Sequence, residues 1–139
     1  MKKMRFFSLL VLALLALTVA ACEFSFSTAN VKSATLARDY RNGEAVDPTT
    51  VFDQTDQVLH LVVKVANAPD DTKLKASWQV VEVEGYEPSV IDESEMAIGS
   101  GEDTFDFTLA NDQAWPAGKY KVDLYLNDEL NQSLEFQVQ

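Results

Sequence analysis

The stretch that decides the fold is Lys73-Leu74-Lys75-Ala76-Ser77-Trp78-Gln79-Val80. Its apolar residues recur at every second position, and lysine, serine and glutamine occupy the positions between them. A period of two is typical of a β-strand with one buried face, because successive side chains of a strand point to opposite sides. We therefore predict a strand over 73–80 that buries Leu74, Ala76, Trp78 and Val80.

The same alternation continues on both sides of this strand. It predicts further strands at 30–38, 58–66, 104–109, 119–127 and over the last residues of the chain. Turn-forming residues separate them, as in Asn67-Ala68-Pro69-Asp70-Asp71 and Asn127-Asp128-Glu129. Between 81 and 103 glycine and proline break the pattern, so one or two short edge strands are expected around 81–83 and 96–98. About seven short strands and no helix predict an all-β, antiparallel sandwich.

Two aromatic residues carry a resemblance to a known family. Trp78 is inward on the third predicted strand, and Trp115-Pro116-Ala117-Gly118-Lys119-Tyr120 leads into the penultimate one. In immunoglobulin-like sandwiches a Trp of the third strand packs between the sheets, and a Tyr at the start of the penultimate strand bonds the backbone upstream, the tyrosine corner. Residues 30–139 resemble this family or its fibronectin-type relatives, which implies one sandwich domain. The usual inter-sheet disulfide is absent, since Val122 stands where the second cysteine would be.

The first 21 residues have the order of a secretory signal peptide, with a basic head followed by an apolar run that ends in small residues. Val19-Ala20-Ala21-Cys22 resembles the lipobox of bacterial lipoproteins. The resemblance implies cleavage between Ala21 and Cys22 and lipidation of the Cys22 thiol. A membrane-spanning helix is a poorer interpretation, because Ser8 and Thr18 interrupt the run and it stops at Cys22. Residues 22–29 are expected to form the lipidated N-terminus and a short tether.

Cys22 is the only cysteine, so the mature chain has no internal disulfide. The alternative to an anchor is an ordinary secreted protein whose thiol happens to lie near the cleavage site. The resemblance to Gram-negative lipoproteins implies three acyl chains. Three chains anchor a protein durably in a membrane, whereas a single chain gives only marginal binding. In those families an Asp after the cysteine retains the protein in the inner membrane, and Glu23 departs from that rule. We expect a lipid-anchored protein of the cell membrane or outer membrane that faces the periplasm or the exterior.

Charge and length restrict the class of function. Without residues 1–21 the chain has 118 residues, enough for one domain, with eight basic and 22 acidic side chains and a formal net charge of −14. Such a surface repels phosphate backbones, and no cluster of Lys or Arg is present, so no nucleic-acid partner is expected. The acidity is interpreted as a source of solubility, with an acidic docking face as the alternative.

Residues that catalysis would need are sparse. His60 is the only histidine and is expected to point outward between Leu59 and Leu61. The mature core has no cysteine nucleophile and no Gly-x-Ser-x-Gly elbow, and Ser77 would meet His60 only by accident. Gly99 and Gly101 form only Gly-x-Gly, which does not indicate a nucleotide site. The sequence predicts neither an enzyme nor a cofactor.

Acidic residues cluster in the expected loops, which raises the question of calcium. The clusters are Asp53 and Asp56; Asp70 and Asp71; Asp92, Glu93 and Glu95; and Asp103 and Asp106. Calcium takes six to eight oxygen ligands, and none of the clusters has the spacing of an EF-hand loop. One histidine and one lipid-bearing cysteine exclude a transition-metal cluster. Solvated turns are the preferred interpretation, and no metal ligand is assigned.

Binding is the class of function that remains. The candidate interaction residues are Tyr86, Val90, Ile91, Trp115 and Tyr125. Each has a structural alternative: the first three as cover for a sheet edge, Trp115 as a cap on the core beside Tyr120, and Tyr125 as ordinary surface. An edge strand could also pair with another chain.

The favoured function is a lipid-anchored envelope lipoprotein that serves as a non-catalytic structural or interaction module. Its partners are membrane lipid, through acylated Cys22, and a protein or glycan of the envelope. The alternative is a periplasmic binding module for a small apolar ligand or calcium. Large inward residues argue against a ligand cavity, because Trp78, Phe105, Phe107 and Phe136 would fill a small sandwich. An enzyme would need a cleft that joins several carboxylates.

Overall fold

The computed structural model describes residues 28–139, without the side chain of Glu102. The expected signal peptide, Cys22 and most of the tether lie outside the described residues. The described part contains nine strands: β1 (Asn30–Arg41), β2 (Glu44–Pro48), β3 (Val51–Phe52), β4 (Val58–Ala68), β5 (Thr72–Val83), β6 (Ser89–Ile98), β7 (Gly101–Ala110), β8 (Gly118–Leu126) and β9 (Glu129–Val138). It holds no helix that could cross a membrane.

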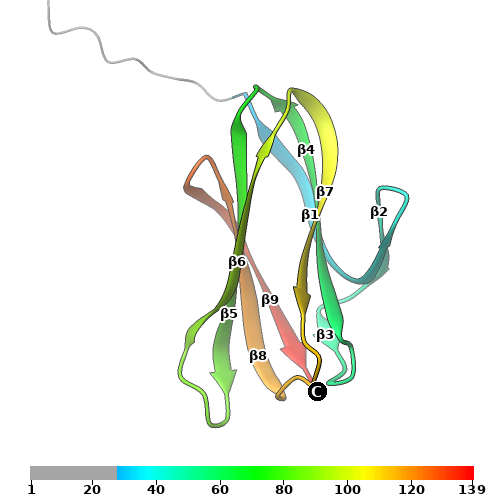
Figure 1. Cartoon of the computed structure of the whole chain (residues 1–139), viewed down its shortest axis with the longest axis vertical. Helices are drawn as coiled ribbons and strands as arrows, with labels where there is room; N and C mark the ends of the chain where they lie inside the picture. Colours follow the sequence, from blue (N-terminus) through cyan, green and yellow to red (C-terminus); the bar gives the residue numbers. More distant parts are fainter. Residues whose placement is uncertain (1–27) are drawn as a thin grey trace, which may run out of the picture.

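The strands form a sandwich of two sheets (Figure 1). One sheet has the order β2-β1-β4-β7 and the other the order β3-β9-β8-β5-β6. Within residues 28–139 the strands pair antiparallel, except for the two-residue parallel pair of β3 with β9. The inward side chains of both sheets form one apolar core, in which Trp78, Leu61 and Val122 are fully buried. The predicted all-β sandwich is confirmed, and Trp78 packs inward as expected.

Two segments differ from the sequence prediction. β5 runs on to Val83, and β6 is one continuous strand where one or two short edge strands were expected around 81–83 and 96–98. Only Ile98 of β6 is buried, so main-chain pairing with β5 holds this strand and no alternation of apolar residues marks it. The short β2 and β3 raise the number of strands from about seven to nine. They lie on either side of Thr49 and Thr50, in a segment too brief to show a period of two.

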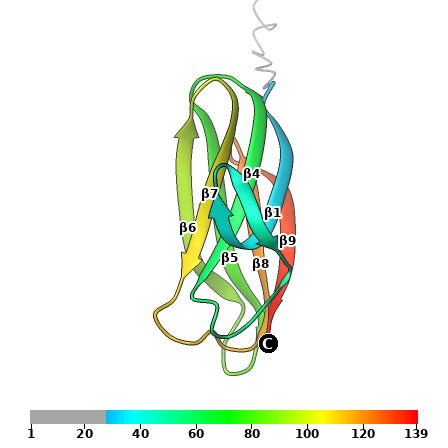
Figure 2. The same cartoon turned by 90° about the vertical axis from the view of Figure 1, so that its right-hand side faces the viewer.

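The β1–β2 hairpin folds over the outer face of the four-stranded sheet. Figure 2 shows it in front of β4 and β7. Lys64, on the outer face of β4, donates from Nζ to Glu44 Oε1 at 2.8 Å and so links the hairpin to the sheet. Side chains beneath the hairpin are therefore shielded from solvent although they point away from the core, and Val62 is only 2% exposed.

The two ends of the sandwich carry different segments. β1 begins at the end that also holds the β4–β5 and β6–β7 turns, where Thr28 Oγ1 donates to the carbonyl of Asn67 at 2.8 Å. The C-terminus, the β5–β6 turn and the β7–β8 loop lie at the opposite end (Figure 1). We refer to these as the N-terminal end and the C-terminal end.

Candidate interaction site

The β7–β8 loop at the C-terminal end is fixed by the predicted tyrosine corner. The Tyr120 hydroxyl donates to the carbonyl of Pro116 at 2.6 Å, and the ring stacks on Phe136 with centroids 5.5 Å apart. Burial, with a smaller electrostatic effect of Tyr86, raises the pKa of Tyr120, so this hydroxyl remains a donor well above neutral pH. The tyrosine corner therefore holds the loop against the five-stranded sheet.

Trp115 is held firmly in this loop and is only 6% exposed. Its backbone N–H donates to the carbonyl of Gln54 at 2.9 Å, and its indole Nε1 donates to the carbonyl of Asp56 at 2.7 Å. Both hydrogen-bonding groups are thus satisfied within the chain. Trp115 caps the core, as in the structural alternative, and is not a freely exposed contact residue.

The β5–β6 turn and the start of β6 place three other candidate interaction residues, Tyr86, Val90 and Ile91, opposite Trp115. Gly85 has the left-handed φ of 84°, and the Tyr86 N–H donates to the carbonyl of Val83 at 3.1 Å. A bulge follows, because Trp78 is opposite Asp92 while Gln79 is opposite Val90, which leaves Ile91 as the additional residue. A bulge re-aims side chains that would otherwise alternate between the two faces.

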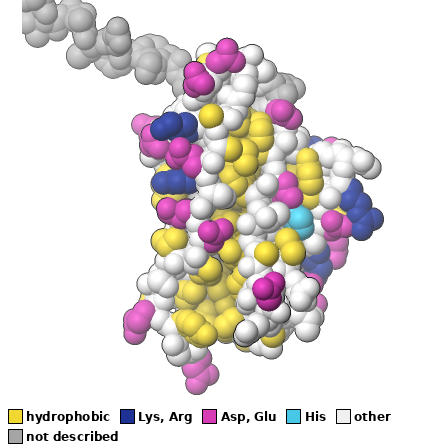
Figure 3. Space-filling model, in the orientation of Figure 1, with side chains coloured by type: hydrophobic (Ala, Val, Ile, Leu, Met, Phe, Trp, Pro, Cys, Tyr) yellow, Lys and Arg dark blue, Asp and Glu magenta, His cyan; other side chains and the backbone are white. Residues whose placement is uncertain are grey.

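The two segments enclose a pocket of about 280 Å³ at the C-terminal end. Its lining is Val80, Val83, Tyr86, Ser89, Val90, Ile91, Asn111, Trp115, Pro116 and Tyr120. Figure 3 shows apolar surface in this region, between β6 and β7. Four of the five candidate interaction residues meet here; Tyr86 and Val90 are exposed by 60% and 54%. The core residues Val80 and Val83 also line the pocket; alternation predicted only Val80 as an inward residue.

Tyr125 lies apart from this pocket. It is on β8, where it is opposite Lys75 of β5, on the face of the five-stranded sheet that points away from the core. Lys75 Nζ lies 4.4 Å from the centroid of the tyrosine ring, so the lysine covers part of it. Tyr125 therefore does not contribute to one surface with the other four candidates.

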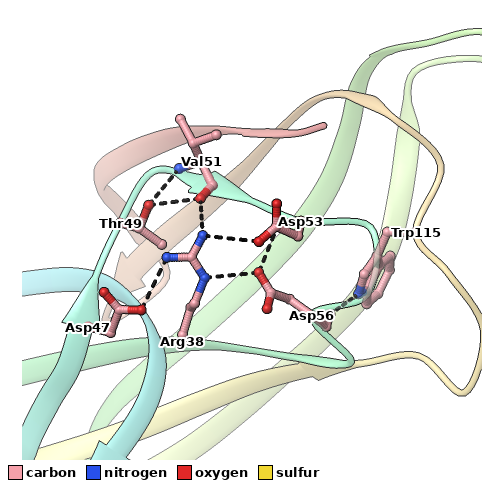
Figure 4. Close-up of polar contacts among 7 residues, drawn as sticks. All are labelled: Arg38, Asp47, Thr49, Val51, Asp53, Asp56 and Trp115. Atoms are coloured by element: carbon pink, nitrogen blue, oxygen red, sulfur yellow. Dashed lines mark hydrogen bonds and ion pairs between the residues drawn. The ribbon is translucent and has the colours of Figure 1, made fainter.

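Arg38 organises a polar cluster behind Trp115 that the sequence pattern did not reveal (Figure 4). Its guanidinium donates to the carbonyl of Val51 at 2.8 Å, to Asp56 at 3.1 Å and to Asp47 at 3.2 Å. Burial lowers the pKa of Arg38, but the bonds and charges of Asp56 and Asp47 outweigh it and raise the pKa overall. The cluster positions Asp56, whose carbonyl accepts from Trp115. The signal in the sequence is Arg38 followed within 18 residues by four aspartates, of which Asp47, Asp53 and Asp56 join the cluster.

Several residues of the acidic clusters considered for calcium make other contacts. Asp53 lies 3.7 Å from Arg38, and Asp70 accepts the Ser100 N–H. Asp106 Oδ2 lies 2.8 Å from Nδ1 of His60, on the outer face of the four-stranded sheet over which the β1–β2 hairpin folds. The side chains of His60 and Asp106 are 15% and 16% exposed. Within the described residues, no group of three or more His, Cys, Asp or Glu is arranged to hold a metal ion.

No protein-family model and no curated protein matches the chain. Several solved structures are similar to the chain. An immunoglobulin-like protein from Pseudomonas aeruginosa is 12% identical with a TM-score of 0.51, over 83% of this chain and 99% of that one. An alkylpurine DNA glycosylase from Pseudomonas fluorescens bound to abasic-site DNA is 13% identical with a TM-score of 0.54, over 81% of this chain and 31% of that one. A β-glucosidase from Listeria innocua is 14% identical with a TM-score of 0.52, over 83% and 16%.

These similarities define the class of the fold. The chain is an immunoglobulin-like β-sandwich without an inter-sheet disulfide. It spans less than a third of the two enzymes to which it is similar. Because the same sandwich serves many unrelated functions, the function must be argued from the site.

Proposed function

We propose that the chain is a lipid-anchored lipoprotein of the cell envelope whose sandwich is a non-catalytic interaction module, with the pocket at the C-terminal end as its binding surface. The observation that carries the proposal is the meeting of Tyr86, Val90, Ile91 and Trp115 around one apolar pocket. Exposed apolar groups that are contiguous on a soluble domain commonly mark a site of interaction.

The anchor is inferred from the lipobox-like Val19-Ala20-Ala21-Cys22. Residues 23–29, if extended, hold the domain within about 20 Å of the lipid. β1 begins at the N-terminal end, so this arrangement turns the C-terminal end and its pocket away from the membrane (Figure 1). A partner would then approach from the periplasmic or exterior space and not from the bilayer.

A protein or glycan partner is favoured over a small ligand because the pocket is open; its size is close to the lower limit of that of small-molecule sites. Sites for small molecules generally have about 300 to 1,000 Å³ and bury most of the ligand. The pocket has about 280 Å³ and continues into the exposed Tyr86 and Val90. A protein is favoured over a glycan because the lining is mainly apolar. The apolar lining also keeps a small apolar ligand as the second candidate.

The pocket lining supports a non-catalytic role. Apart from tyrosines it contains no titratable side chain, and Ser89 and Asn111 are its other polar residues. Acid–base catalysis would need a group with a pKa near the working pH. His60 and Asp106 lie on the outer face of the four-stranded sheet and do not line the pocket.

The anchor is tested by cell fractionation of wild type and Cys22→Ala, with incorporation of labelled palmitate as a second readout. The proposal predicts that wild type is labelled and sediments with membranes, while Cys22→Ala is unlabelled and soluble. A Cys22→Ala protein that stays in the membrane would rule out the lipid anchor.

The interaction is tested by chemical cross-linking in intact cells. Wild type, Ile91→Ser and Leu130→Ser are compared, because Ile91 and Leu130 are both exposed, at 39% and 57%, and only Ile91 lines the pocket. One envelope protein should be captured by wild type and Leu130→Ser and lost with Ile91→Ser. Native mass spectrometry that finds a bound small molecule, released by Ile91→Ser, would support the second candidate instead.

A further inference from the structure

The four sheet edges of the described residues differ in length. β2 and β3, which end the two sheets on one side, have five and two residues. β6 and β7 end them on the other side and have ten residues each. A long edge strand presents unpaired N–H and C=O groups with which an extended chain can pair, and short edge strands limit this. Addition of a further strand is therefore easiest on the side bounded by β6 and β7 (Figure 1).

β6 is the better acceptor of the two strands. Its first five residues, 89–93, are exposed, whereas β7 buries Phe107 and Leu109 in the core. Val90 and Ile91 connect this edge to the apolar pocket. A strand that pairs with β6 would thus direct alternate side chains toward the pocket and the others toward the outer face, where Glu93 and Glu95 lie opposite Ser77 and Lys75.

The charge of the β6 side indicates the chemistry of the segment that would pair with it. Residues 76–118, which include the second half of β5, all of β6 and β7, and the β7–β8 loop, contain no Lys or Arg. The ten acidic residues of this segment are Glu82, Glu84, Glu87, Asp92, Glu93, Glu95, Glu102, Asp103, Asp106 and Asp112. Complementary charge guides partners together and selects among them. The first half of β6, residues 89–94, lies opposite residues of β5 that include no lysine and is thus complementary to a basic segment, whereas Lys73 and Lys75 lie opposite its second half.

We propose that the β6 edge binds an extended, basic segment of another envelope protein by strand addition, with one apolar or aromatic side chain of that segment in the pocket. This inference rests on the proposed function and specifies its partner. Main-chain hydrogen bonds provide affinity in this mode, and pockets for alternate side chains provide specificity. The bulge at Ile91 interrupts the edge and so restricts the register in which the segment pairs.

A second copy of the chain does not fit this edge. Pairing β6 with β6 would bring Asp92, Glu93 and Glu95 of two molecules together, and like charges on neighbouring strands destabilise pairing. Repulsion of the wrong partner is a common basis of specificity. We therefore predict that the protein alone is monomeric in sedimentation experiments at low salt.

The probe for the test is the synthetic peptide Lys-Val-Lys-Trp-Lys-Val-Lys, blocked at both ends and added to the full-length chain, expressed with its own leader and purified in mild detergent. Alternation places its lysines on one face and Val and Trp on the other. We expect a Kd on the order of 10 μM, as for many short-peptide interactions, and shifts of the amide signals of residues 89–95 in NMR spectra. A peptide with Glu in place of each Lys should bind at least tenfold more weakly.

Backbone pairing is separated from simple charge attraction by two N-methylated peptides, one methylated at the lysines and one at Val and Trp. Alternate residues of a strand direct their N–H groups to opposite edges, so one of the two should lose at least tenfold in affinity. Ile91→Ser should weaken binding by a similar factor, while Leu130→Ser and the doubly neutralised Asp70→Asn/Asp71→Asn control should leave it within twofold. These control residues are exposed and lie outside the pocket lining.

Strand addition is overturned if both methylated peptides bind as well as the parent, or if the acidic peptide binds as well as the basic one. It is also overturned if the parent peptide does not bind, or if the purified protein self-associates through β6. In each case the cellular cross-linking experiment gives a separate answer. If the cross-linking in cells still captures a protein in a way that depends on Ile91, the chain remains an interaction module with another kind of partner. If neither the peptide binding nor the capture in cells is observed, the proposed function is wrong as well.

Discussion

Gly118 begins β8, opposite Val83 of β5. Its φ is 152°, and a Cβ at this position would lie 2.5 Å from the carbonyl oxygen of Glu82 and 2.7 Å from Val83 Cγ2. We predict that Gly118→Ala destabilises the domain by roughly 2 to 4 kcal/mol, because the backbone must shift to admit the methyl group. Urea denaturation measures the change. Gly99→Ala is the matched control, since nothing lies within 4 Å of its Cβ, and equal stability of the two variants would contradict the account.

We predict that Asp123 makes the stability depend on pH. Burial raises its pKa, but hydrogen bonds from Ser133, Lys121 and Gln79 outweigh this effect, and the pKa is lowered from 3.8 overall. The native state therefore binds fewer protons than the unfolded state, so this contribution is present above about pH 4 and is lost as the pH falls through the native pKa.

Urea denaturation at about pH 6, 4, 3 and 2 tests this linkage. Wild type should lose stability below about pH 4, and Asp123→Asn should lose less over the same range because its side chain does not titrate. Asp112→Asn, at an exposed position, should retain the wild-type profile. An Asp123→Asn profile that parallels wild type would show that this carboxylate does not carry the effect.

Single residues were predictable from the sequence where a period or a motif constrains them. Trp78 follows from alternation, and the contact of Tyr120 with Pro116 follows from the tyrosine-corner resemblance. Alternation shows to which face a side chain points, but not which residue of a distant strand lies beside it. The pairing of His60 with Asp106, 46 positions apart, depends on the register of β4 with β7 and could not be inferred.

At the scale of elements, the segment from β2 to β3 connects the two sheets, and Arg38 holds it. The guanidinium bonds Asp47 at the end of β2, Val51 in β3 and Asp56 after β3. We predict that Arg38→Ala costs roughly 1 to 2 kcal/mol, since several charge-assisted hydrogen bonds at a partly buried side chain are lost. Hydrogen exchange of the backbone amides in 50–57 should become faster.

Arg41→Ala is the control for this prediction. Arg41 pairs with Asp39 but its side chain is 71% exposed, against 30% for Arg38. An exposed pair of this kind contributes little, so we expect a change within about 0.5 kcal/mol. The prediction fails if the two variants are equally stable, or if exchange in 50–57 is unaffected by Arg38→Ala.

Elements with one buried face were predictable, and those without one were not. β4, β5, β7, β8 and β9 appear in the sequence as alternating apolar residues because they pack on the core. β6 is exposed almost throughout, so its sequence marked only the part around 96–98, where a short edge strand was expected. The sequence also did not show that the candidate residues form one pocket. The bulge at Ile91 and the hydrogen bonds that fix Trp115 bring these residues together, and both depend on tertiary structure.

At the scale of the whole molecule, the sandwich has two functionally distinct ends. β5 has 12 residues and thus a length of about 40 Å, which separates the N-terminal end from the pocket. With the proposed anchor at Cys22, the pocket stands away from the membrane on a strongly acidic domain. The charge of −14 was evident from the sequence, whereas its concentration around the β6–β7 side depends on the sheet order.

The most direct measurement is photo-cross-linking in intact cells, with a photoreactive phenylalanine in place of Tyr86 at the mouth of the pocket. The same substitution at Tyr125, on the outer face of the five-stranded sheet, is the control. We predict that position 86 cross-links to one envelope protein through a basic segment of that protein, that position 125 does not, and that Cys22→Ala reduces the yield. Equal cross-linking from both positions, or none from position 86, would contradict the assignment of the pocket as the binding surface.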